Sequence, residues 1–218
     1  MGSLIMTVSR KEIERYLGCR GGADERTRQL IEACLLELEQ AVTPHSICQT
    51  TDLSIGEDRL SMGGLTVTSR YLARHLRNCR QAVLMAATLG PGADRLLQQK
   101  ACVDMSAAVV MQACAAAMIE AVCDDVQAQV ASAARERGLY VRPRFSPGYG
   151  DWPLIDQKAL LDRLEAAKRI GLTVTDSLML APTKSVTAVI GLTDQPGGCH
   201  VHKCKTCDKT DCAFRQTD

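Results

Sequence analysis

The segment from Arg142 to Pro153 gathers residues whose chemistry suits a small anionic ligand. It holds three of the seven prolines and the only tryptophan of the 218-residue chain. Proline fixes φ, whereas glycine permits positive φ and lets a ligand approach the main chain closely. Arg144 offers a planar guanidinium that can bind a carboxylate through two parallel hydrogen bonds. The segment is therefore either a ligand-binding loop or a structural connector between helices.

The segment also contains Tyr149 and Trp152, and both residues fit either a ligand-binding loop or a structural connector. Their rings could receive a cation or stack on a flat ring of a ligand. The alternative is that both rings are buried and anchor the segment to the core.

A second cluster of reactive side chains lies near the C-terminus. Its four cysteines are separated by four, two and four residues, and they are Cys199, Cys204, Cys207 and Cys212. Thiolates at such spacing favour zinc or an iron–sulfur cluster over magnesium or calcium. The alternative is a tail of redox-labile thiols without a metal. A Gln-Pro-Gly-Gly linker precedes the cluster, so we expect a domain over residues 1–195 and a cysteine-rich tail over residues 196–218.

The loop resembles a motif of the activation domain of cobalamin-dependent methionine synthase. Arg144-x-x-x-Gly148-Tyr149, preceded by Arg-Pro, is similar to the S-adenosylmethionine-binding motif of that family. Gly-Leu-Thr-Val-Thr-Asp-Ser-Leu-Met at 171–179 and Pro-Thr-Lys-Ser-Val at 182–186 resemble two further segments of the same family. The resemblance implies a free-standing form of this domain.

The resemblance also implies roles for individual residues in binding S-adenosylmethionine. Arg144 is expected on the carboxylate and Glu120 on the amino group. The main chain around Gly148–Asp151 is expected against the adenine or ribose, and Tyr149 against the sulfonium or the sugar. For Glu120 the alternative is a solvated helical edge, where it shares one face with Asp124.

The function implied by the resemblance is repair of a cobalamin cofactor. The chain would bind S-adenosylmethionine and support reductive methylation of the cobalamin of a partner corrinoid-dependent methyltransferase such as methionine synthase. It would thus be the activation component of that enzyme, with a flavodoxin-like protein as electron donor. Two other functions stay open. One is a metal or iron–sulfur redox module that delivers electrons to a corrinoid protein, and the other is a regulatory S-adenosylmethionine-binding module without turnover.

Hydrophobic periodicity predicts the elements that position these residues. We expect a single α+β domain with helices packed around a twisted, mainly antiparallel sheet, because the strands come as hairpins without a regular βαβ rhythm. The longest helix is expected to break once near 103–106. Helices are expected over 8–17, 24–41, 69–80, 100–137 and 156–170, and strands within 46–67 and over 82–88, 172–180 and 185–192.

Two further features are interpreted as structural. The segment Leu89–Asp94 follows a strand and contains two glycines, but it lacks the glycine spacing and the lysine of phosphate-binding loops, so we expect a turn. His75 lies beside the apolar face of a predicted helix, where a packing or surface role is favoured over a ligand role.

Composition excludes several classes of function. The net charge is +1 and aromatic residues make up 3% of the chain, so we expect no binding to nucleic acid. No run approaches the roughly 20 apolar residues of a membrane span, so no membrane association is expected. The start lacks a secretory signal, which predicts a cytoplasmic protein. The seven cysteines outside the tail are therefore expected as small apolar residues in helices or strands.

Overall fold

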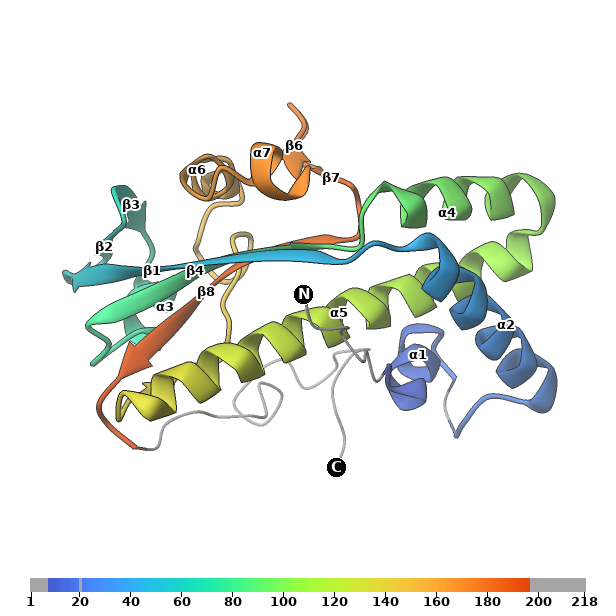
Figure 1. The fold of residues 1–218 in the computed structure, drawn as a ribbon, viewed down its shortest axis with the longest axis horizontal. Helices are drawn as coiled ribbons and strands as arrows, with labels where there is room; N and C mark the ends of the chain where they lie inside the picture. The colour runs from blue at the N-terminus through green and yellow to red at the C-terminus, as the bar shows by residue number, and fades with distance from the viewer. Residues whose placement is uncertain (1–7, 20, 197–218) are drawn as a thin grey trace.

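The computed structural model describes residues 8–19 and 21–196, which form an antiparallel sheet covered by helices on both faces (Figure 1). The described residues make a six-stranded sheet in the order β3-β2-β1-β4-β8-β5, in which every neighbouring pair is antiparallel. The predicted α+β class is confirmed. The strands of this sheet are β1 (His45–Ile55), β2 (Arg59–Met62), β3 (Leu65–Thr68), β4 (Gln81–Thr88), β5 (Tyr140–Val141) and β8 (Ser185–Thr193).

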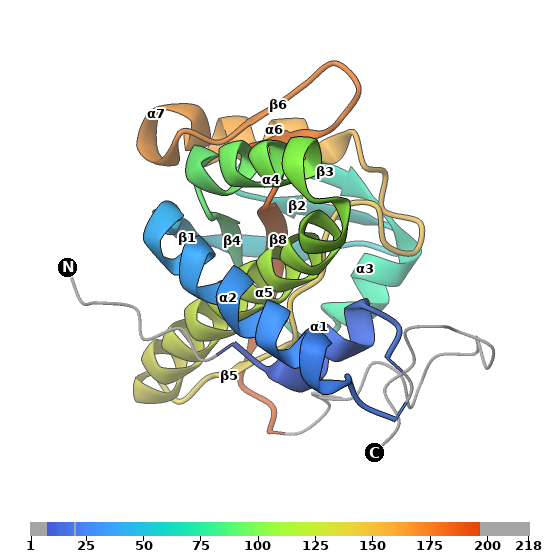
Figure 2. The same cartoon turned by 90° about the vertical axis from the view of Figure 1, so that its right-hand side faces the viewer.

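The helices lie in two layers on either side of the sheet. In Figure 1 the long α5 crosses below the sheet together with α1 and α2, while α6 and α7 lie above it. Figure 2 shows α2 crossing α5, with α4 above them. The helices are α1 (Arg10–Tyr16), α2 (Glu25–Ala41), α3 (Arg70–His75), α4 (Pro91–Val103), α5 (Met105–Glu136), α6 (Asp156–Arg163) and α7 (Ala166–Ile170).

The central strand β4 is buried on both faces. Val83, Met85 and Ala87 belong to the apolar core on the α5 side. The alternate residues Leu84 and Ala86 belong to the core on the α6 side. A continuous apolar run is therefore needed here, since side chains of a strand alternate between its two faces.

Helix α5 is the main support of the sheet. An 18-residue window of this helix has a mean hydropathy of 1.7, so by length and composition alone it could cross a membrane, contrary to the sequence expectation. Within the described structure 67% of that window is buried, as for the core helix of a globular protein. The buried alanines let α5 approach its neighbours closely, and they are Ala107, Ala108, Ala113, Ala115, Ala117 and Ala134.

Several predicted boundaries need correction. The expected break in the longest helix falls at Asp104, whose carboxylate accepts a hydrogen bond from the Ala107 backbone and so caps α5. The predicted helix 156–170 divides where Glu165 adopts a left-handed conformation with φ of 51°. The predicted strand 172–180 is wrong, because only β6 (Thr173–Val174) and β7 (Leu180–Ala181) are extended and they pair with each other. The helix predicted over 69–80 ends at His75.

Five of the seven cysteines of the described residues lie in helices or strands as predicted, namely Cys34, Cys48, Cys102, Cys114 and Cys123. Cys34, Cys79, Cys114 and Cys123 are buried. Burial raises the pKa of Cys114 and of Cys123 to about 12, so these thiols stay protonated at neutral pH. The prediction was wrong for Cys19 and Cys79, which lie outside the helices and strands. Cys48 and Cys102 are exposed, and periodicity did not show which face they occupy.

The turn at Leu89–Asp94 serves packing between helices. Pro91 opens α4, a position where its missing N–H costs nothing. Gly92 is buried where α4 begins against the end of α2, and any Cβ atom there would overlap the Ala41 carbonyl oxygen. The carboxylate of Asp94 accepts bonds from the Thr183 backbone and hydroxyl at 2.8 and 2.5 Å. These contacts agree with the structural interpretation of this segment.

Gly92→Ala is expected to lower the free energy of unfolding by about 1–3 kcal/mol. The new Cβ atom would overlap the Ala41 carbonyl oxygen, so α4 would have to move away from the end of α2. Urea denaturation followed by circular dichroism measures this. Gln99→Ala, an exposed position on the same helix, serves as the control and should change stability by less than about 0.5 kcal/mol. Wild-type stability in Gly92→Ala would contradict this account of the turn.

Candidate functional site

The segment that carries Arg144 is held along the free edge of β8. After α5 the chain forms β5, which pairs with the end of β8. The edge pairing continues, since the Arg142 backbone donates to the Gly191 carbonyl at 2.8 Å. Phe145 and Val189 then exchange backbone hydrogen bonds of 2.9 and 2.8 Å. The arginine therefore sits on a short extended stretch with a fixed register rather than on a free loop.

The Arg144 side chain reaches across to α5, where two carboxylates receive it. Its Nη2 donates to Glu120 at 2.5 Å and its Nη1 donates to Asp124 at 2.6 Å. Its backbone N–H donates to the Gln127 side chain at 3.0 Å. Residues 120, 124 and 127 share one face of α5, so a stretch of about two turns of this helix holds one arginine. We call Arg144, Glu120 and Asp124 the arginine triad.

The triad is half-enclosed and carries a net negative charge. The Arg144 side chain is 15% exposed, whereas those of Glu120 and Asp124 are 41% and 71% exposed. Burial lowers the pKa of Arg144, but the hydrogen bonds that it donates to Glu120 and Asp124 outweigh this and raise that pKa above its ordinary value. The guanidinium is thus permanently charged. The triad can contact a group of either sign from the solvent side.

The structure brings the predicted Arg144 and Glu120 together. Asp124 was seen in the sequence only as a neighbour of Glu120 on one helix face, and its bond to Arg144 was not foreseen. Gln127 was missed. The available signal was its position seven residues after Glu120, which puts it on the same helical stripe.

The Pro-Gly-x-Gly turn follows the triad and is exposed. Gly148 and Gly150 have φ of 89° and 58°, a region that other residues rarely adopt. The turn closes on itself, because the Gly148 backbone donates to the Trp152 carbonyl at 2.9 Å. A side chain at Gly150 would come within 3.0 Å of the Tyr71 ring. Both glycines are therefore required by the backbone itself.

Of the two aromatic residues that the sequence left as either ligand contacts or core anchors, one is buried and one is exposed. Trp152 is 2% exposed, stacks on Phe145 with ring centroids 6.2 Å apart and donates to Asp156 at 3.0 Å. It is a core anchor. Tyr149 is 66% exposed and touches Phe145 edge-on, so most of its ring faces solvent. His75 packs on Phe145 and donates from Nε2 to the Pro143 carbonyl at 2.7 Å, which agrees with a packing role.

Asp151 ties the turn to the start of α3. Its carboxylate accepts from the Ser69 hydroxyl and from the backbone N–H groups of Arg70 and Tyr71, at 2.9 and 3.1 Å for the last two. The hydrogen bond from Ser69, followed by those from Tyr71 and Arg70, lowers the pKa of Asp151. The residue whose main chain is predicted to lie against the adenine or ribose thus uses its side chain to hold α3. Its partners lie about eighty residues away in sequence, where no local pattern reveals them.

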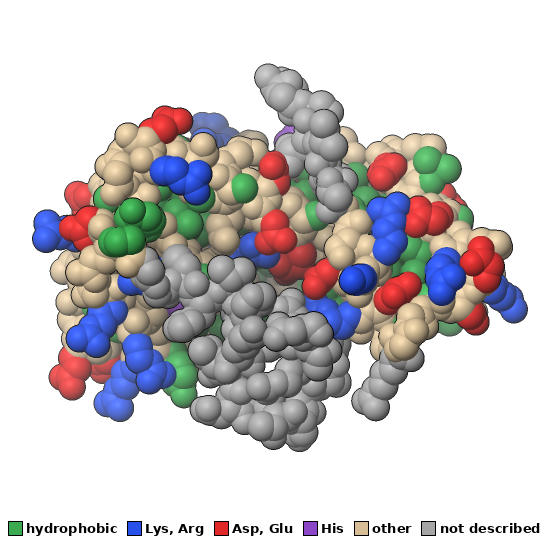
Figure 3. Space-filling view, turned by 90° about the horizontal axis from the view of Figure 1, so that it is seen from below, with side chains coloured by type: hydrophobic (Ala, Val, Ile, Leu, Met, Phe, Trp, Pro, Cys, Tyr) green, Lys and Arg blue, Asp and Glu red, His purple; other side chains and the backbone are tan. Residues whose placement is uncertain are grey.

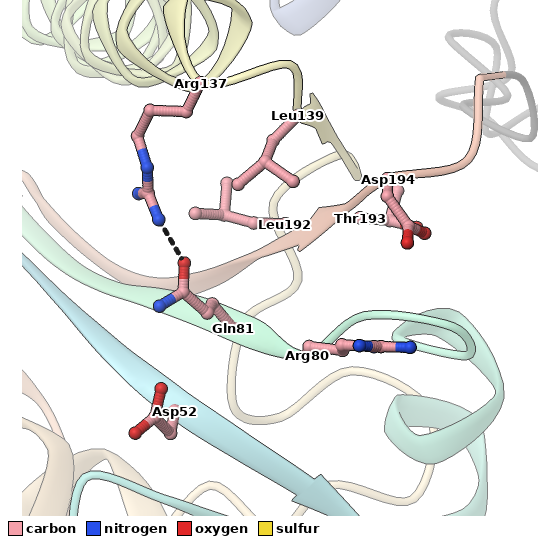
Figure 4. A pocket seen from close by; sticks show the side chains of 8 residues that line it. All are labelled: Asp52, Arg80, Gln81, Arg137, Leu139, Leu192, Thr193 and Asp194. Carbon is pink, nitrogen blue, oxygen red and sulfur yellow. Dashed lines mark hydrogen bonds between the residues drawn. The ribbon is translucent and has the colours of Figure 1, made fainter.

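One surface cleft lies where the end of β8 meets β4. This cleft of about 460 Å³ is lined by Arg80, Arg137, Asp52 and Asp194 around an apolar floor (Figure 4). Arg137 is held there by a 2.7 Å bond to Gln81. Acidic and basic side chains are interspersed on the face seen from below (Figure 3).

The predicted metal ligands Cys199, Cys204, Cys207 and Cys212 lie outside the described residues, as does nearly all of the predicted tail unit 196–218. Within residues 8–19 and 21–196 no group of three or more His, Cys, Asp or Glu side chains could hold a metal ion.

The antiparallel sheet with helices on both faces defines an α+β domain that carries an arginine–carboxylate cluster beside the edge of β8. A family model described as vitamin B12 dependent methionine synthase, activation domain, matches residues 69–217. Since this covers more than half of the chain, the protein belongs to that activation-domain family.

Thirteen chains of solved structures also match this protein. One is described as the MetH reactivation domain bound to AdoHcy; it is 15% identical, with a TM-score of 0.63, and the match covers 86% of this chain and 77% of that one. At this identity the likeness concerns the fold. No curated protein matches the sequence.

Asp151→Ala is expected to lower the melting temperature at pH 7, and the difference from wild type should shrink as the pH falls below about 4. The pKa of this carboxyl is lowered in the folded protein, so its contribution is present above the unfolded pKa and disappears as the carboxylate is protonated. Thermal unfolding at several pH values measures it.

The control for this experiment is Asp162→Ala, an exposed aspartate on α6. It should show no comparable pH-dependent difference. A constant difference between Asp151→Ala and wild type from pH 7 to about 3 would show that the carboxylate charge does not stabilise the start of α3.

Proposed function

We propose that this chain binds S-adenosylmethionine at the arginine triad and the 148–151 turn, and that it supports reductive methylation of the cobalamin of a partner corrinoid-dependent methyltransferase. The observation that carries the proposal is the 2.5 Å contact between Arg144 and Glu120. It places a cation and an anion side by side at an accessible edge. Family membership and the likeness to a reactivation domain described as bound to AdoHcy support the same ligand class.

The triad fits the amino-acid part of the ligand. A carboxylate and an ammonium on one carbon lie only a few ångströms apart, so their recognition needs opposite charges that are also adjacent. Arg144 supplies N–H donors to the carboxylate and Glu120 supplies an acceptor to the ammonium. The partly buried position of Arg144 strengthens such contacts relative to a fully solvated pair.

The exposed turn fits the remainder of the ligand. Tyr149 offers an aromatic face that suits a sulfonium or the sugar. The main chain of Gly148–Asp151 carries no bulky side chain at two positions, so an adenine or ribose edge can approach its peptide groups. The Asp151 carboxylate is already bonded to α3, so its contribution to binding is to hold the turn in place.

The chemical contribution of this chain is positioning. The partner's cobalamin would accept the methyl group, so no nucleophilic side chain is needed here. Arg144 and Glu120 fix one end of S-adenosylmethionine and the turn fixes the other, which leaves the methyl group to be aligned with the acceptor. Alignment of two reactants can remove a large part of a barrier. A flavodoxin-like electron donor and a cytoplasmic location belong to the same proposal.

The cysteine spacing of the tail favours a second function beside the first. Cys199, Cys204, Cys207 and Cys212 would bind zinc or an iron–sulfur cluster, and a cluster could deliver electrons to the corrinoid partner. The third possibility, a regulatory module that binds S-adenosylmethionine without turnover, differs only in the absence of methyl transfer.

Arg144→Ala is expected to weaken S-adenosylmethionine binding by about 1.5–3 kcal/mol, which is roughly a tenfold to hundredfold loss of affinity. The reason is the loss of a charge-assisted bond to the ligand carboxylate. Isothermal titration calorimetry measures it, and Arg135→Ala, an exposed position near the end of α5, is the matched control. The same variant should lose transfer of a labelled methyl group to a reduced corrinoid methyltransferase.

Two results would argue against parts of this proposal. Unchanged affinity in Arg144→Ala would remove the triad from the ligand site. Binding without any methyl transfer, with an electron donor and several corrinoid methyltransferases present, would favour the regulatory module.

Deletion of residues 199–218 is expected to remove bound zinc or iron and to leave S-adenosylmethionine affinity nearly unchanged, because the linker separates the tail from the triad. Elemental analysis and calorimetry of anaerobically purified protein measure the two effects. Absence of zinc and iron from the full-length protein would contradict the metal prediction. A brown colour would indicate an iron–sulfur cluster rather than zinc.

A further inference from the structure

The two terminal nitrogens of Arg144 are occupied by acids of its own chain. Nη1 bonds to Asp124 at 2.6 Å and Nη2 bonds to Glu120 at 2.5 Å. A ligand carboxylate that binds the end of a guanidinium through two parallel bonds needs a hydrogen on both nitrogens in that direction. Each terminal nitrogen therefore already gives one of its hydrogens to an acid of the same chain, so a ligand carboxylate that approaches this end competes with Asp124 or Glu120.

The two acids are not equally committed to this contact. The Asp124 side chain is 71% exposed and that of Glu120 is 41% exposed. Arg144 is the only ion-pair partner of Asp124 within the described residues. Exposed ion pairs contribute little, because the freed carboxylate is fully hydrated. Asp124 can therefore leave Arg144 more easily than Glu120.

Charge counting points the same way. The triad holds two carboxylates and one guanidinium, a net charge of −1. A third carboxylate that entered while Asp124 stayed would put three anions around one cation. If Asp124 turns out to solvent instead, the ligand carboxylate replaces it one for one, and Glu120 remains to accept from the ligand ammonium.

We propose that Asp124 is a displaceable occupant of the carboxylate subsite. The ligand's amino-acid carboxylate takes its place on Nη1 of Arg144, so Asp124 lowers the affinity for any ligand with such a carboxylate. This inference rests on the proposed function. It assigns Asp124 a role in specificity, since its effect depends on whether the ligand carries an amino-acid group.

The test compares two neutral thioether ligands by calorimetry, namely S-adenosylhomocysteine and methylthioadenosine, which lacks the amino-acid group. Neither carries the sulfonium charge, so removing one negative charge does not change attraction to a cationic ligand. Asp124→Asn should bind S-adenosylhomocysteine about two- to fivefold more tightly than wild type. Its affinity for methylthioadenosine should be unchanged.

Asp125→Asn is the matched control, because this neighbouring carboxylate on α5 accepts from Gln129 and has no bond to Arg144. It should change neither affinity. Glu120→Gln should bind S-adenosylhomocysteine more weakly than wild type, which is the opposite direction to Asp124→Asn. Asp124→Ala repeats the test without an amide that could still accept from Nη1.

The failures can be told apart. If wild type binds neither S-adenosylhomocysteine nor S-adenosylmethionine, the proposed function fails and this inference fails with it. If wild type binds S-adenosylhomocysteine while Asp124→Asn and Asp124→Ala bind it equally or more weakly, the inference alone is overturned. Tighter binding of both ligands in these variants would also overturn it, since the effect would then be independent of the carboxylate.

Discussion

Burial of the central strands on both faces is the constraint on which the rest of this structure depends. Strand β4 pairs with β1 on one side and β8 on the other over eight residues each, and its side chains alternate between two apolar cores. This fixes the position of β8, and β8 in turn offers a free edge. The chain that returns from α5 pairs with that edge, which leaves Arg144 facing the helix that the core has already placed below the sheet.

The triad shows how such a scaffold can hold a charged group that is partly buried. An arginine removed from water needs partners for its charge, and α5 provides two carboxylates and one amide from a single stripe. Arg144 contacts Glu120 and Asp124 on a partly exposed face of α5, so both carboxylates remain partly hydrated.

The glycine turn and α3 extend this arrangement away from the triad. Asp151 closes the start of α3 from a distant part of the chain, and Trp152 fixes the turn to the core below it. Tyr149 is left between these two anchors with its ring exposed. The turn is therefore rigid at both ends and open in the middle, which is the arrangement that a binding loop needs.

The sequence by itself determined the class of fold, because the helical and strand periodicities and the absence of a βαβ rhythm are local properties. It also determined that Arg144, Gly148 and Tyr149 form one motif, and that a glutamate at 120 belongs with them through the family resemblance. That residues 175–179 connect β6 and β7 as a turn was not predicted, although Asp176 and Ser177 are turn-forming residue types.

Only the tertiary structure decided which partners the charged residues take. Asp151 meets α3, and Asp124 and Gln127 meet Arg144, through contacts that span from 17 to 82 positions of the chain. Such pairings arise from the way the sheet and α5 are packed, and side-chain type alone does not specify them. Likewise, burial of Trp152 and exposure of Tyr149 depend on which side of the turn faces the core.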